Sequence, residues 1–116
     1  MLNLAVVLFA IAALGGLVLA SAHFRGKEKP MPVVILHGLL AASGLVLLLV
    51  PLLRGAAPES VKIPLILFLA AALGGFLLLA FHLQKKKLPS AVVVVHGGIA
   101  VVAFVLLVSG LYLRHG

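Results

Sequence analysis

Residues 2–24 read LNLAVVLFAIAALGGLVLASAHF, and this stretch decides the fold. It contains no Asp, Glu, Lys or Arg, and it is as long as the roughly 20 residues that a helix needs to cross the hydrocarbon core of a bilayer. Three similar stretches follow at 31–53, 63–83 and 88–113. Because a chain in lipid must satisfy its backbone hydrogen bonds internally, each stretch is predicted to be a transmembrane helix.

The composition of the whole chain agrees with this prediction. Of its 116 residues, 65% are hydrophobic and 9% are charged, whereas about 25% of the residues of a soluble domain are charged. There is no cysteine, which excludes disulfides, a cysteine nucleophile and thiolate metal sites. The net charge of +7 comes from short basic clusters between the apolar stretches. The partner that we expect for these cations is therefore the lipid headgroup layer and not nucleic acid.

The chain contains an internal duplication. Residues 3–57 align without gaps to 62–116, an offset of 59 residues (82 − 23), and 20 of the 55 aligned positions are identical. Ala20-Ser21-Ala22 resembles a signal-peptide cleavage site, but the first span is the counterpart of the third, so we expect it to be retained. The informative matches are Ala12-Ala-Leu-Gly-Gly16 with Ala71-Ala-Leu-Gly-Gly75, His23 with His82, Pro30 with Pro89, and His37-Gly38 with His96-Gly97.

The duplication predicts an all-α fold, a polytopic membrane four-helix bundle made of two tandem two-helix repeats, 1–57 and 61–116. The short connections make neighbouring helices antiparallel. Both repeats enter the membrane in the same sense, so a pseudo-twofold axis along the membrane normal should relate them. Six of the nine Lys and Arg residues lie in the loops 25–29 and 84–87. The positive-inside rule then places these two loops in the cytoplasm and both termini outside, in a bacterial inner membrane.

Histidines are the candidate functional residues. His23 and His82 lie at the loop ends of the first and third spans, and His37 and His96 lie about one and a half turns into the second and fourth. All four should therefore share one layer of the membrane. A single histidine near a helix end is most often an interfacial residue or an interhelical hydrogen bond. Two duplicated pairs of costly intramembrane imidazoles instead favour ligation. His115 is terminal and receives no role.

Haem is the cofactor that this pattern of histidines favours. Zinc or copper would need all four imidazoles on one ion, because the spans contain no Asp, Glu or Cys, whereas haem needs two axial imidazoles and an apolar slot. Glycines offer room for a flat macrocycle: Gly16 and Gly75 lie seven residues before a histidine, and Gly44 lies seven after one. Small residues also let helices approach each other without any cofactor, so both uses of the glycines remain open.

The pattern of paired histidines with nearby glycines resembles the haem core of membrane b-type cytochromes, namely the cytochrome b561-like proteins and the cytochrome b of quinol-oxidising complexes. The resemblance covers all four spans and rests on the four histidines with Gly16, Gly44 and Gly75. It implies haem b and electron transfer with a quinone or a partner redox subunit. Those families often carry two histidines on one helix and haems on both sides of the membrane. Here each helix carries one histidine, and all four lie on one side.

The sequence does not determine which histidines would share a haem. One haem could lie on the axis between His37 and His96, with His23 and His82 around its propionate edge. Two off-axis haems could instead each take one shallow and one deep histidine, and the duplication slightly favours two. The lysines of 85–87 serve as a topology anchor in the plainer interpretation, and together with Arg25 they could pair with haem propionates.

Two functions without haem are the alternatives. The chain could be a cofactor-free scaffold or an accessory subunit of a larger membrane complex. A homo-oligomer is a further possible assembly. The chain could also carry protons or metal ions through its imidazoles, although such paths usually use intramembrane carboxylates. There is no Ser–His–Asp arrangement, phosphate loop or carboxylate pair, which argues against a hydrolase or kinase. An electron carrier or subunit is therefore expected rather than a stand-alone enzyme.

Overall fold

The computed structural model describes residues 2–113 and is helical throughout apart from its connections. The helices are α1 (Leu2–Phe24), α2 (Met31–Leu53), α3 (Lys62–Leu83) and α4 (Ser90–Val108). A short 3-10 helix, η1 (Glu59–Val61), precedes α3, and a π-helical segment, η2 (Ser109–Leu113), extends α4. The all-α prediction is confirmed. The first two helices have the expected bounds, the third begins one residue earlier, and the fourth begins at Ser90 rather than at 88.

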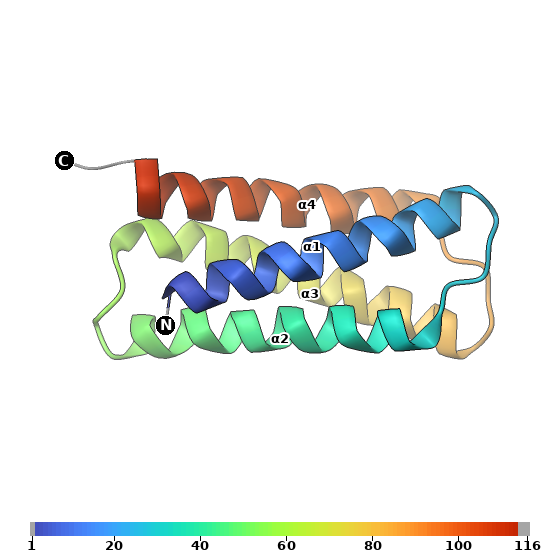
Figure 1. Ribbon diagram of the computed structural model, residues 1–116, viewed down its shortest axis with the longest axis horizontal. Coiled ribbons are helices and arrows are strands. Elements are labelled where there is room, and N and C mark those ends of the chain that lie inside the picture. The colour runs from blue at the N-terminus through green and yellow to red at the C-terminus, as the bar shows by residue number, and fades with distance from the viewer. Residues whose placement is uncertain (1, 114–116) are drawn as a thin grey trace.

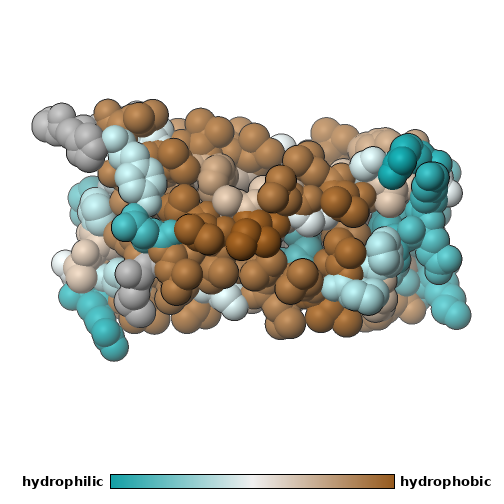
Figure 2. Space-filling model, in the orientation of Figure 1, coloured by the Kyte–Doolittle hydropathy of each residue, from teal (hydrophilic) through white to brown (hydrophobic). Residues whose placement is uncertain are grey.

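The helices form two antiparallel hairpins that lie side by side. Helix α1 packs along α2, and α3 packs along α4; α1 then contacts α4, and α2 contacts α3. Figure 1 shows both short loops at one end of the bundle, with the α2–α3 connection at the other. All four helices are long and apolar enough to cross a membrane. Apolar side chains cover the middle of the rod, and hydrophilic side chains gather at its ends (Figure 2).

Helices α1 and α3 end with the same backbone motif. The Lys27 N–H donates to the Ala22 carbonyl at 2.8 Å, and the equivalent Lys86 N–H donates to the Phe81 carbonyl at 3.0 Å. Such a helix end needs one residue in the left-handed conformation, for which glycine is preferred. Gly26 takes this position after α1 with a φ of 66°, but Lys85 takes it after α3 with a φ of 57°.

The densest core occupies the half of the bundle away from the two short loops, which we call the phenylalanine half. The rings of Phe9 and Phe68 stack there with centroids 3.9 Å apart and planes 1° apart. These residues are equivalent in the repeat (68 − 9 = 59), so the pseudo-twofold axis passes between them. The buried residues of this cluster are Ala5, Phe9, Leu48, Val61, Leu65, Phe68, Ala103 and Leu107.

Candidate functional site

The two deep histidines meet on the same axis in the other half of the bundle, which we call the histidine half. His37 comes from α2 and His96 from α4, and their ring centroids are 6.2 Å apart with the planes at 84°. Both side chains are partly buried. Because the two residues are repeat equivalents, their approach extends the pseudo-twofold relation from the phenylalanine stack to the histidine half.

Each deep imidazole is hydrogen-bonded to the other helix of its own hairpin. The Nδ1 atom of His37 lies 2.7 Å from the Ala12 carbonyl oxygen, and Nδ1 of His96 lies 2.7 Å from the Ala71 carbonyl oxygen. A carbonyl oxygen only accepts hydrogen bonds, so Nδ1 is the donor in both cases. In the neutral ring this leaves Nε2 with a free lone pair. Metal-binding histidines are commonly oriented by such a bond to a backbone carbonyl.

Glycines make this hydrogen bond possible. In a helix the carbonyl of residue i points toward residues i+3 and i+4, and for Ala12 these are Gly15 and Gly16. A Cβ atom at Gly16 would lie 3.1 Å from Cε1 of His37, and one at Gly75 would lie 3.1 Å from Cε1 of His96. The repeated Ala-Ala-Leu-Gly-Gly motif therefore exposes one carbonyl and leaves space for one imidazole. We call each such unit, His37 with Ala12 and Gly16 or His96 with Ala71 and Gly75, an imidazole clasp.

All three glycines that were predicted to leave room for a macrocycle lie against a protein side chain in the structure. Gly16 and Gly75 each lie against the imidazole of the adjacent helix. Gly44 borders the phenylalanine half, where a Cβ atom would lie 2.9 Å from the ring of Phe9. Its repeat equivalent, Ala103, is fully buried.

The shallow histidines differ from each other. His23 Nε2 lies 3.0 Å from the Ser90 hydroxyl, a contact that joins α1 to α4 and so links the two hairpins. The repeat equivalent of Ser90 is Met31 (90 − 59), which has no hydroxyl. Among residues 2–113, no three His, Asp or Glu side chains gather where they could hold a metal ion. The four-imidazole zinc or copper site considered from the sequence is therefore not formed by these residues. His115 lies outside them.

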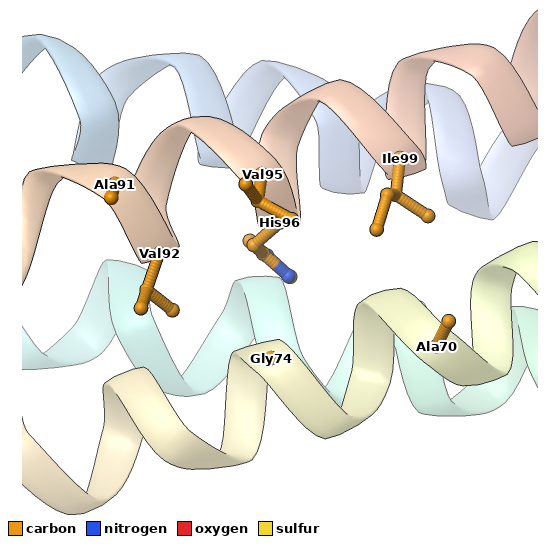
Figure 3. A pocket seen from close by; sticks show the side chains of 7 residues that line it. All are labelled: Ala70, Gly74, Ala91, Val92, Val95, His96 and Ile99. Atoms are coloured by element: carbon orange, nitrogen blue, oxygen red, sulfur yellow. The ribbon is translucent and has the colours of Figure 1, made fainter.

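A groove of about 210 Å³ runs beside the second clasp. In Figure 3 the groove lies between α3 and α4, with α1 and α2 behind it, and His96 projects from α4 toward Gly74. Ala70, Ala91 and Val95 line it. The first repeat carries the larger residues Ile11, Pro32 and Leu36 at these three positions.

Sequence reasoning did not identify the carbonyl partners of the deep histidines. The detectable signal was an interval: Ala12 precedes His37 by the same 25 residues that separate Ala71 from His96, and glycines stand three and four residues after each alanine. A contact far from the histidines was also missed, in which the Tyr112 hydroxyl donates to Oδ1 of Asn3. This hydrogen bond has no equivalent elsewhere in the duplication, because the residues that correspond to Tyr112 and Asn3 are Leu53 and Lys62.

Comparison with known proteins adds no relative: no protein-family model, curated protein or solved structure matches this chain.

Proposed function

We propose that the protein is a small b-type cytochrome in which His37 and His96 hold a single haem between the two hairpins. The observation that carries the proposal is the approach of these two imidazoles on the pseudo-twofold axis. The Ala12 and Ala71 carbonyls fix the Nδ1–H tautomer of each ring and leave Nε2 available to iron. The pairing of the two deep rings favours one axial haem over two off-axis haems.

The donor set fits a bis-histidine iron. His37 would supply one imidazole to the iron and His96 the other, one from each hairpin. The centroids of His37 and His96 are 6.2 Å apart. The histidine half also lacks a densely packed core of its own. Its buried residues, Ala12, Ala22, Ala71 and Leu88, include only one large side chain. An apolar ligand there would complete the core.

When bound, the haem would supply a one-electron redox couple, and the chain's own residues would orient and enclose it. Arg25 and the lysines of 85–87 lie at the end of the bundle nearest the deep histidines, where their cations can pair with carboxylates. The electron partner in this proposal is a quinone or a redox subunit. The two short loops carry six Lys and Arg residues, whereas the other end of the bundle carries Arg54 and Lys62. This difference favours a cytoplasmic position for the short loops, in a bacterial inner membrane. Arg114, counted with that end, lies outside the described residues.

An optical spectrum tests the proposal. The protein is expressed with excess haem precursor, purified in mild detergent and measured with and without dithionite. We expect a Soret band that shifts on reduction and one haem per chain by pyridine haemochrome. His37→Asn and His96→Asn keep a side-chain N–H donor for the carbonyl but cannot bind haem iron as imidazole does, so each should lose the band. His82→Asn is the matched control and should keep it.

A protein that takes up no haem under these conditions would overturn the proposal, provided that its helicity by circular dichroism is normal. Two haems per chain, or a Soret band that survives both deep asparagine variants, would reject the His37–His96 pairing.

A cofactor-free scaffold is the second candidate, and the clasps favour it. Each deep imidazole already fills the space at a glycine and is hydrogen-bonded across its hairpin. The groove beside His96, about 210 Å³, is smaller than the 300 Å³ or more that is typical of ligand pockets. Under this alternative, the asparagine variants assemble normally and no preparation shows a Soret band.

A further inference from the structure

We propose that the loop end of the bundle binds anionic phospholipid headgroups, independently of any haem. Figure 2 shows a hydrophilic cap at this end of the rod, beyond the apolar band. The cap contains the α1–α2 and α3–α4 loops, which meet at the same end (Figure 1). We call it the basic cap, and its cations are Arg25, Lys27, Lys29, Lys85, Lys86 and Lys87.

The cations of the basic cap are not neutralised within the described chain. Glu28 is the single acidic residue of these loops. Among residues 2–113 the recorded ion pair joins Lys62 to Glu59 at 3.0 Å, at the opposite end of the bundle. All cap cations are exposed except Lys29, which is partly buried. Clusters of four to eight Lys or Arg residues directly beside a membrane span attract anionic lipids.

Lys85 gives a second and independent indication. It occupies the left-handed position that ends α3, where the equivalent residue after α1 is Gly26. The α2 end uses Gly55 in the same conformation, with a φ of 68°. A side chain in this conformation is strained by contact with its own carbonyl, whereas glycine is not. The chain thus keeps a cation in the basic cap at a position where glycine would be more stable.

The surroundings of the cap indicate a phospholipid rather than a soluble anion. Phe24 and Leu83, the last residues of α1 and α3, directly precede the two basic loops. Their side chains are 59% and 60% exposed. A ligand with a phosphate at the level of the lysines and acyl chains along these apolar residues would contact both surfaces. Free phosphate could use only the cations.

The test compares thermal unfolding in nanodiscs of phosphatidylcholine alone and of phosphatidylcholine mixed with phosphatidylglycerol, followed by circular dichroism. We expect the anionic lipid to raise Tm and high salt to reduce the increase. Lys86→Gln/Lys87→Gln should lose at least half of the increase. The matched control, Arg54→Gln/Lys62→Gln, removes two cations from the other end and should keep it. Lys85→Gly should raise Tm in neutral lipid, because strain is relieved, and should lower the response to anionic lipid.

Three results would overturn the proposal. The first is an equal loss of response in the Lys86→Gln/Lys87→Gln variant and in its control, which would indicate general attraction of a basic protein to an anionic surface. The second is no Tm response to phosphatidylglycerol in the unmodified chain. The third is the same Tm increase produced in neutral nanodiscs by soluble glycerol phosphate, which would indicate a site for a free anion.

Discussion

The phenylalanine half and the histidine half are built from the same four helices, yet they pack differently. In the first, large apolar side chains from both hairpins meet, and the Phe9 and Phe68 rings stack on the axis. In the second, small residues predominate in the interior, and each deep imidazole packs within its own hairpin. In the phenylalanine half, large apolar side chains therefore hold the two hairpins together, whereas in the histidine half the deep imidazoles hydrogen-bond within their own hairpins and the contact of His23 with Ser90 joins the hairpins.

Removing a stacked ring should have the largest effect on this contrast. Phe9→Ala deletes a ring that is 5% exposed and leaves a cavity in the phenylalanine half. We expect it to lower the free energy of unfolding by about 3 kcal/mol, the usual cost of such a truncation. SDS titration followed by circular dichroism measures the change. Phe24→Ala, at a residue 59% exposed, is the control and should cost far less. Similar losses for the two variants would contradict the assignment of the core.

Adding one methyl group to the same half should have the next largest effect. In Gly44→Ala the new Cβ atom would lie 2.9 Å from the Phe9 ring, which cannot move freely because it stacks on Phe68. We expect a loss of about 2 kcal/mol, within the range for overpacked cores. Gly38 has open space around it, so Gly38→Ala should be neutral or stabilising in the same SDS titration. A neutral Gly44→Ala would show that the stack is mobile.

Replacing a glycine by alanine in the histidine half should lower the free energy of unfolding by a smaller amount. In Gly16→Ala and Gly75→Ala the new Cβ atom would lie 3.1 Å from an imidazole carbon, so a small displacement of the ring relieves the contact. We expect each to lower stability by about 1 kcal/mol, roughly the value of one weakened hydrogen bond. Equal effects are expected because the two clasps are equivalent. Solid-state NMR of labelled His37 and His96 would report the change at Nδ1. A large difference between the two variants would contradict the equivalence.

The smallest effect is expected at the contact between shallow residues. Ser90→Ala removes the hydroxyl that lies 3.0 Å from His23 Nε2, at a partly exposed site. We expect a loss of about 0.5 kcal/mol, at the low end for a hydrogen bond. Met31→Ser is the reciprocal variant, because it places a hydroxyl at the repeat equivalent of Ser90. It should show a gain relative to Met31→Ala in the same titration. No difference between these two variants would mean that the hairpins are not related closely enough to reproduce the contact.

The fold could be predicted from the sequence because lipid leaves few alternatives. Uninterrupted apolar stretches determine the spans, and the bounds of α1 and α2 agree with those expected. The end of α4 was less predictable. The sequence indicates a single apolar stretch, but the backbone changes to a π-helix at Ser109, and a Cβ atom at Gly110 would lie 2.8 Å from Cβ of Ser60. The segment packs against η1, a contact that a local sequence pattern does not contain.

The candidate site was predictable in part. The depth of the histidines follows from counting residues along each helix, and the structure places the rings of His37 and His96 with centroids 6.2 Å apart. Which residues face each other across a hairpin depends on helix rotation, and helices that are apolar all round give little information about rotation. For this reason the counting of residues linked Gly16 to His23 on one helix, whereas its contact is with His37 on the next.

The phenylalanine stack also has a consequence for the origin of the chain. Phe9 meets its own repeat equivalent across the axis, as His37 meets His96. Identical residues facing each other are what a symmetric dimer of one hairpin would present, because a twofold interface joins each patch to its copy. The fused chain retains these self-contacts and adds one-sided contacts, such as Ser90 with His23, that two identical hairpins would have to make twice or not at all. Two copies joined in one chain can therefore carry different residues on the two sides of one interface.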